Sequence, residues 1–173
     1  MKKLSVLLAT LLFSVFAFGQ GYRYKAAGGN KLKFDVGVDA AGTLGDMATF
    51  IPFGIGVTAK IGYNVTPKFQ LNATTGIIEF LGTTYSGIQY PNEAYVPFRV
   101  GFSYLPAPKF HIDASLGSGT FFVSGSSGTG FSYSTGLGYT IADRIDVSTR
   151  YEGVSKQGTT SWIGFRVAYR IIK

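Results

Sequence analysis

The sequence contains no cysteine, one histidine and one tryptophan in 173 residues. The absence of cysteine excludes disulfides and a lipid-modified N-terminal cysteine. With one histidine and no clustered carboxylates, we expect no transition-metal site and no other cofactor. Only 14% of the residues are charged, and the formal excess of +7 is scattered singly along the chain. Nucleic-acid-binding proteins gather Lys and Arg on one face, so we expect no nucleic-acid partner.

The chain begins with two lysines, followed by an apolar stretch over residues 4–18 that ends in Ala17-Phe18-Gly19. This three-part layout predicts a secretory signal peptide over residues 1–19, followed by a periplasmic segment over 20–30. The competing interpretation is a membrane-anchoring helix, which requires about 20 apolar residues, more than this stretch provides.

Beyond the signal, apolar residues recur at every second position, the periodicity of strands with one apolar face. Eight such stretches of about ten residues follow one another, a length that crosses a bilayer at a tilt. They cover residues 32–40, 53–62, 69–77, 96–104, 110–117, 131–141, 145–152 and 163–171. We therefore predict an all-β fold, an eight-stranded antiparallel up-and-down transmembrane β-barrel, over residues 31–173. Glu79 interrupts the apolar face of the third stretch, and we expect that strand to leave the membrane or to shift register there.

The connections alternate in length. Three are short and carry Pro, Asn or Asp, the residues of tight turns, and they cover 63–68, 105–109 and 142–144. Four are longer and cover 42–50, 81–94, 122–130 and 154–161. In outer-membrane barrels the short turns and both termini face the periplasm, and the long loops face outward.

Periodicity alone leaves open which face points inward, because a soluble lipocalin-type barrel encloses its apolar face around a ligand. Many of the 24 glycines fall on the polar face of the predicted strands. Glycine weakens a strand on an open surface, whereas the interior of a narrow eight-stranded barrel has just enough room for side chains, so small residues are needed there. We therefore assign the polar face to the interior.

The predicted inner face carries nearly balanced charges, and buried charges persist when they are paired. The inward carboxylates are Asp35, Asp39, Asp113, Asp146 and Glu152. The inward cations are Lys33, Lys60, Arg99, Arg150, Arg166 and Arg170. We predict a charge network that plugs the lumen, with three of its arginines at mid-height. Its members are Asp35, Lys60, Arg99, His111, Asp113, Asp146, Arg150, Glu152, Arg166 and Arg170. The competing interpretation is a narrow solute channel lined by the same charges.

Aromatic residues of the apolar face gather near the predicted periplasmic boundary, where amphipathic rings occupy the lipid–water interface. They are Tyr63, Phe69, Tyr104, Phe110, Tyr139 and Tyr169. A second group near the outer boundary includes Phe53, Phe131, Tyr133 and Tyr151. We interpret the two groups as aromatic girdles.

With these features the chain resembles the small outer-membrane β-barrel family, the OmpA-like and OmpX-like barrels, over residues 31–173. The resemblance rests on architecture. It implies residence in the bacterial outer membrane, contact with its lipid and lipopolysaccharide, and recognition by the outer-membrane assembly machinery. Members of the family commonly end in an aromatic residue, whereas this chain ends Ile171-Ile172-Lys173, which departs from the usual insertion signal.

The sequence predicts no set of catalytic residues. His111, Asp113 and Ser115 share one face of a strand, but neighbours two apart lie about 7 Å from each other along the backbone, so this row alone makes no triad. Glycine-rich segments such as 125–130 lack the Lys and the helix of a phosphate loop, and we interpret this one as a flexible outer loop. We predict a non-enzymatic barrel with a structural or surface-interaction role. Its outer loops offer Tyr85, Tyr90 and Tyr95 to a partner or surface ligand.

Overall fold

A computed structural model describes residues 31–156 and 158–172; the predicted signal peptide (1–19) and the 20–30 segment lie outside the described residues. The described residues form ten strands and one short helix. In order they are β1 (Leu32–Leu44), α2 (Met47–Phe50), β2 (Phe53–Asn64), β3 (Phe69–Leu81), β4 (Thr84–Tyr85), β5 (Ile88–Gln89), β6 (Glu93–Ala107), β7 (Phe110–Val123), β8 (Ser126–Ala142), β9 (Ile145–Ser155) and β10 (Thr159–Ile172). None of the described helices is long and apolar enough to cross a membrane.

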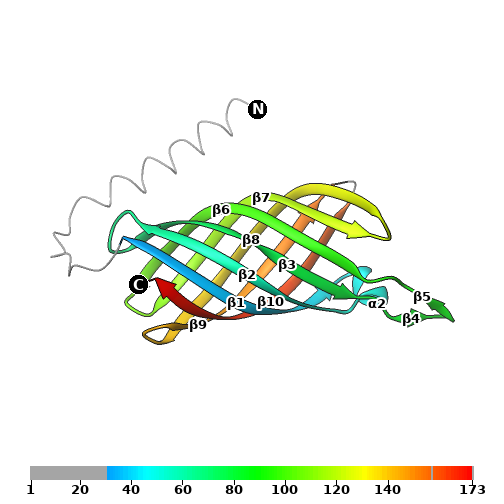
Figure 1. The fold of residues 1–173 in the computed structure, drawn as a ribbon, viewed down its shortest axis with the longest axis horizontal. Helices are drawn as coiled ribbons and strands as arrows, with labels where there is room; N and C mark the ends of the chain where they lie inside the picture. The colour runs from blue at the N-terminus through cyan, green and yellow to red at the C-terminus, as the bar shows by residue number, and fades with distance from the viewer. Residues whose placement is uncertain (1–30, 157, 173) are drawn as a thin grey trace, which may run out of the picture.

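Eight of these strands close into one antiparallel barrel, in the order β1-β10-β9-β8-β7-β6-β3-β2 (Figure 1). Strands that follow one another along the chain pair with each other, and β1 closes the barrel against β10 over pairs such as Val38 with Val167. The remaining two, β4 and β5, form a separate hairpin that projects beyond one end of the barrel (Figure 1). The predicted eight-stranded up-and-down barrel is confirmed.

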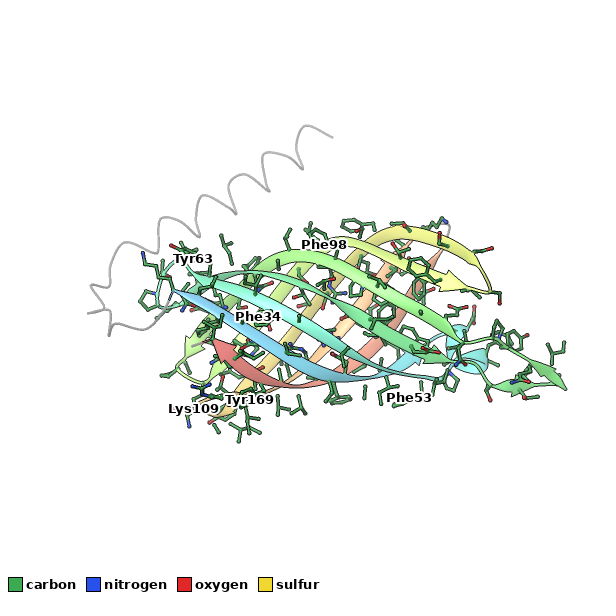
Figure 2. All side chains as sticks on the ribbon, viewed as in Figure 1. Phe34, Phe53, Tyr63, Phe98, Lys109 and Tyr169 are labelled. Carbon is green, nitrogen blue, oxygen red and sulfur yellow. The ribbon has the colours of Figure 1, made fainter. Side chains whose placement is uncertain are left out.

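The apolar face of the strands is the exterior. Val38 is 60% exposed, Phe98 61% and Phe165 61%, and such side chains radiate from the barrel wall (Figure 2). Their polar neighbours are enclosed, with Asp39 and Arg99 each 2% exposed. The lipocalin-type alternative is therefore wrong, because a soluble barrel would bury the apolar residues and expose the polar ones.

Glycines allow the strands and inner side chains to pack closely. A Cβ on Gly101 would lie 2.1 Å from the carbonyl oxygen of Ala114, and one on Gly76 would lie 2.4 Å from that of Val57. A Cβ on Gly62 would collide with the side-chain amide of Gln70. These glycines make room for main chain or for a larger inner side chain in a barrel with little free space.

The three short turns are confirmed. Residues 65–68 connect β2 to β3, 108–109 connect β6 to β7, and 143–144 connect β8 to β9. The irregularities of pairing also occur at this end, next to Phe34, Tyr104 and Thr140. Bulges are common at barrel rims, where they bend a strand and end its pairing.

Two of the four predicted long loops are wrong. The strands β7 and β8 continue through most of 122–130 and meet in a two-residue turn, Ser124-Gly125, whose φ values are 47° and 83°. Positive φ at both positions is typical of the tight hairpin turn whose twist matches its strands. Strands β9 and β10 are joined by residues 156–158 alone. The parts of these strands beyond the membrane are rich in Gly, Ser and Thr and do not alternate between apolar and polar residues. Their full length could therefore not be predicted from the periodicity.

The predicted shift of register at Glu79 is also wrong. Strand β3 runs on to Leu81, and Glu79 keeps the register of the preceding pairs with β2 and β6. The β3–β6 pairing is instead interrupted opposite Pro97, between the pairs of Thr75 and Ile78. Proline has no N–H to give to a ladder, which explains the gap.

Candidate functional site in the barrel lumen

A buried ion pair lies at the centre of the lumen. Arg99 of β6 donates from both terminal nitrogens to the two carboxylate oxygens of Glu152 of β9, at 2.8 Å each. The two side chains are 2% and 0% exposed. A bidentate guanidinium–carboxylate pair is among the strongest polar contacts in proteins, and this one spans the barrel between non-adjacent strands.

Two further arginines extend this cluster towards β1. Arg150 of β9 donates to Glu152 and forms an ion pair with Asp39 at 2.6 Å. The Asp39 carboxylate also accepts from the Thr58 hydroxyl at 2.6 Å, and Thr58 accepts from Arg166 Nε at 2.8 Å. A continuous polar chain therefore joins β10, β2, β1, β9 and β6 across the lumen.

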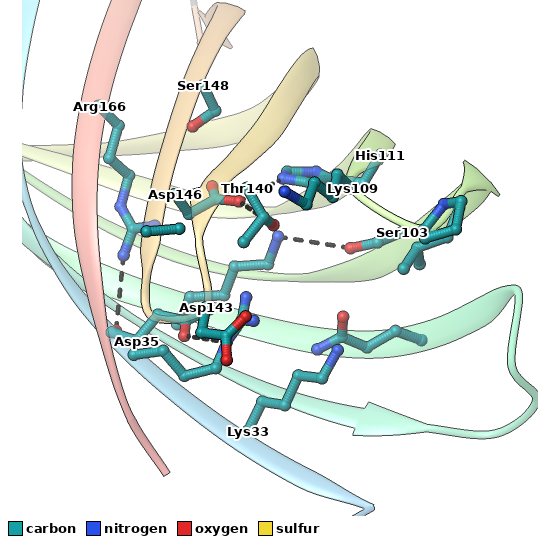
Figure 3. A pocket seen from close by; sticks show the side chains of 16 residues that line it. Lys33, Asp35, Ser103, Lys109, His111, Thr140, Asp143, Asp146, Ser148 and Arg166 are labelled. Atoms are coloured by element: carbon teal, nitrogen blue, oxygen red, sulfur yellow. Dashed lines mark hydrogen bonds and ion pairs between the residues drawn. The ribbon is translucent and has the colours of Figure 1, made fainter. Parts of the chain in front are cut away.

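A second cluster lies closer to the short-turn end (Figure 3). Lys60 pairs with Asp113 at 3.0 Å. His111 lies between two carboxylates, with Nδ1 2.8 Å from Asp113 and Nε2 3.0 Å from Asp146. At its side, Arg170 Nε donates to Asp35 at 2.9 Å. The lumen thus holds all ten residues of the predicted network, together with Asp39.

The histidine is not arranged for catalysis. The Ser103 hydroxyl and His111 bind different oxygens of the same Asp113 carboxylate, so the serine has the acid, not the imidazole, as its partner. A nucleophile needs a base within hydrogen-bond reach, and both ring nitrogens of His111 already face carboxylates. Among the described residues there is also no group of three or more His, Cys, Asp or Glu side chains that could hold a metal ion.

Above the central ion pair, towards the long-loop end, the lumen is aromatic. Trp162, Tyr95 and Phe80 are all 0% exposed, with ring centroids 4.9 Å apart for Tyr95 and Trp162 and 5.1 Å for Phe80 and Trp162. Phe121 packs against Tyr95 at 4.8 Å. Tyr95 also connects the two layers, because its hydroxyl lies 2.8 Å from Ser132 Oγ and accepts from Arg99 at 3.3 Å.

Sequence reasoning missed this aromatic layer, although a signal was present. Each ring lies an even number of residues from an inward polar residue of its strand: Tyr95 from Arg99, Phe121 from Asp113, and Trp162 from Arg166. Tyr95 requires a correction, because it was predicted to offer an outer-loop contact. It is buried in the lumen, because β6 begins at Glu93 and its side chains already alternate between lumen and exterior at Tyr95.

A cavity of about 280 Å³ lies in the lumen at the short-turn end and is lined by residues such as Lys33, Gln70 and Arg170. Another, of about 50 Å³, lies beside Arg99 and Arg150, which is room for only a few water molecules.

No protein-family model matches the sequence, and the search of curated proteins found no match. Solved structures do match in fold. Ail, the attachment invasion locus protein of Yersinia pestis, has a TM-score of 0.60 at 15% identity, covering 81% of this chain and 97% of Ail. The N-terminal barrel domain of Pseudomonas aeruginosa OprF has a TM-score of 0.56 at 14% identity, covering 83% and 99%. Neisserial surface protein A has a TM-score of 0.57 at 12% identity, covering 83% and 98%. This chain has the fold of the small outer-membrane β-barrels.

In outer-membrane barrels of this fold, the apolar exterior meets the lipid of the bacterial outer membrane. The short turns and the N-terminal end of β1 then face the periplasm, and the β4–β5 hairpin faces outward. Tyr63, Tyr139 and Tyr169 are about half exposed on the outer surface next to the short turns, where a periplasmic girdle belongs.

The outer end of this barrel is built from the two long connections. Phe50 of α2 packs against Tyr85 of the hairpin, edge to face at 5.5 Å, and against Tyr90 at 4.6 Å. The Thr83 N–H donates to the Phe50 carbonyl at 2.9 Å. Tyr85 and Tyr90 thus lie at the outer end, as expected, and the two connections support each other.

Proposed function

We propose that this protein is a non-enzymatic outer-membrane barrel whose lumen is closed to solutes and whose outer end contacts a partner. The observation that supports closure is the stacking of two sealed layers, the Arg99–Glu152 pair and the aromatic rings above it. Arg99 and Glu152 of the lower layer, and Phe80, Tyr95 and Trp162 of the upper layer, are each at most 2% exposed. An eight-stranded barrel has an interior just wide enough for such side chains to fill.

Charge pairing is what keeps the lower layer in place. Removing one partner of a buried pair leaves the other charged and desolvated, at a cost of about 3–5 kcal/mol. Moving Arg99 or Glu152 aside to admit a solute would carry a similar cost. Above them, Trp162 would have to leave a packed aromatic cluster at the same time.

Conductance in a planar lipid bilayer tests closure. We expect the wild-type barrel to give no conductance steps. Discrete steps in the wild type that change in size or ion selectivity in Arg99→Met would contradict closure and establish the narrow channel instead. Phe98→Leu, a change on the lipid face of the same strand, is the matched control and should leave the record unchanged.

The outer end points to the chemistry of the partner. Its connections, residues 45–52, 82–92, 124–125 and 156–158, contain one cation, Lys156, and one acid, Asp46. Ail has been solved in complex with the heparin analogue sucrose octasulfate. A polysulfated ligand needs several Lys or Arg side chains, which these connections lack. We propose that Tyr85 and Tyr90, with the exposed Ile88 at the tip, contact an uncharged saccharide.

An array of neutral and sulfated glycans tests this contact. We expect binding to neutral glycans that is lost in Tyr85→Ala and kept in Tyr63→Ala, a change of the same size at the opposite end of the barrel. Binding confined to sulfated glycans, or no binding at all, would contradict the proposal.

We also propose that the protein contacts lipopolysaccharide and the outer-membrane assembly machinery. The alternating Phe165, Val167 and Tyr169 of β10 give the last strand the pattern that we propose for recognition during insertion. Deleting these three apolar side chains together is expected to abolish assembly in cells, as followed by the heat-dependent mobility of the folded barrel.

A further inference from the structure

The 280 Å³ cavity at the periplasmic mouth of the lumen has features that the closed-barrel function does not use. Five of its lining residues are cationic, namely Lys33, Lys60, Lys109, Arg166 and Arg170, whereas three are acidic, namely Asp35, Asp143 and Asp146. Its volume is close to the lower end of ligand-binding pockets, about 300 Å³. The cavity is therefore basic and has the size of a small solute.

Pairing inside the lumen leaves part of this charge uncompensated. Lys60 is paired with Asp113, and Arg170 with Asp35. None of the ion pairs of the described residues involves Lys33, Lys109 or Arg166. Arg166 donates only to neutral oxygens, those of Thr58 and the Asp35 carbonyl. Three cations of the lining, Lys33, Lys109 and Arg166, therefore have no carboxylate partner among the described residues.

A neutral donor completes the lining. Gln70 is only 7% exposed, lines the cavity, and its side chain makes none of the hydrogen bonds found among the described residues. The barrel has made space for it, because its amide nitrogen lies where a Cβ of residue 62 would be, and residue 62 is glycine. The Gln70 amide is not one of the fully enclosed side-chain groups that lack a partner, so it reaches the open space of the cavity and can donate to a ligand there.

Register places these groups together. Lys33 pairs across the sheet with Gly62, and Gly62 pairs with Asn72 on the strand that carries Gln70. Asp35, two residues from Lys33 on the same face, is opposite Lys60 on one side and Arg170 on the other. The inner faces of β10, β1, β2 and β3 thus present their cations and the Gln70 amide to one space, at whose rim Lys33 lies (Figure 3).

We propose that this cavity binds the phosphate group of a small periplasmic molecule, with Lys33, Arg166 and Gln70 as the principal contacts. A phosphate monoester carries about two negative charges at neutral pH, which Lys33 and Arg166 together would balance. The three acidic residues of the lining limit the charge that can enter and exclude large polyanions. The phosphate belongs either to a free solute or to the headgroup of a phospholipid in the periplasmic leaflet.

The proposal is tested with the complete mature barrel in non-ionic detergent and phosphate-free buffer. Binding is measured by ³¹P NMR titration with inorganic phosphate, and separately with a short-chain phosphatidylglycerol. Saturable binding of either probe is expected. Lys33→Gln should weaken it by about 10-fold or more, since a charge-assisted contact is lost. Lys31→Gln, which removes the same charge from an exposed site two residues away, should leave it within about twofold.

The two probes identify the source of the phosphate. Binding of inorganic phosphate supports a free solute, and binding confined to the lipid supports a headgroup. Gln70→Leu provides a second variant that keeps the charge and volume of the lining, and it should also weaken binding. Absence of saturable binding to both probes, or equal weakening by Lys31→Gln and Lys33→Gln, would overturn the site.

Discussion

Replacing Glu152 with Gln removes the one carboxylate shared by the central arginines. In the wild type, Glu152 is 0% exposed and accepts from Arg99 twice at 2.8 Å and from Arg150. A glutamine keeps the shape but carries no charge, so Arg99 stays buried without any acidic partner. Breaking a buried pair in this way costs about 3–5 kcal/mol. Arg150 retains Asp39 at 2.6 Å, which limits the loss to one uncompensated cation.

Urea unfolding of the barrel in lipid vesicles measures this cost. The sole tryptophan, Trp162, is 0% exposed in the aromatic layer next to the pair, so its fluorescence reports on the site itself. Glu79→Gln is the matched control, because Glu79 is an exposed exterior acid that accepts from Asn92, and we expect no measurable change. The double variant Arg99→Met with Glu152→Leu should recover most of the lost stability, because apolar replacement of both partners is often neutral. A loss below about 1 kcal/mol in Glu152→Gln would refute the assignment of the pair to a sealed, desolvated site.

Three further changes test other parts of the barrel. Phe98→Arg puts a cation on the lipid face and should cost about 2–4 kcal/mol of unfolding free energy in vesicles, whereas Phe98→Leu should cost little; equal behaviour of the two would show that the face does not meet lipid. Gly76→Ala should destabilise by about 1–3 kcal/mol through overpacking, since its Cβ would lie 2.4 Å from the Val57 carbonyl, while Gly42→Ala meets nothing within 4 Å and should be neutral in the same urea titration. Trp162→Ala should cost about 3–5 kcal/mol, measured by heat-dependent gel mobility and circular dichroism, and an unchanged midpoint would contradict close packing of the aromatic layer.

The sequence was sufficient for the barrel because its two faces differ in chemistry along every strand. Residues such as Val38 and Asp39 alternate between lipid and lumen, so strand number, direction of the faces and the short turns could be predicted from period and parity. Which of the inward charges pair with each other could not be predicted in this way. Parity places Arg99 and Glu152 on the inner face, but their meeting depends on strand tilt and on which strands lie opposite each other in the closed barrel.

The outer half was predicted less well, for a physical reason. Beyond the membrane, strands need no apolar exterior. The segment around Ser126 to Gly130 consists of small polar residues, a composition that is typical of loops. The inward residues of the outer half are aromatic, whereas those of the periplasmic half are charged. Tyr95 and Trp162 were therefore not assigned to the interior. The β4–β5 hairpin depends on two residues with positive φ, Ser86 and Gly87, a turn that a Ser-Gly pair permits without requiring it.

The central claim, a closed barrel that faces lipid with its apolar side, is tested most directly by fractionating expressing cells and running the outer-membrane fraction on a denaturing gel with and without boiling. The account predicts a band in that fraction whose mobility changes on heating, because a closed barrel resists detergent until it is heated. A soluble periplasmic protein with one mobility would contradict the assignment of inside and outside.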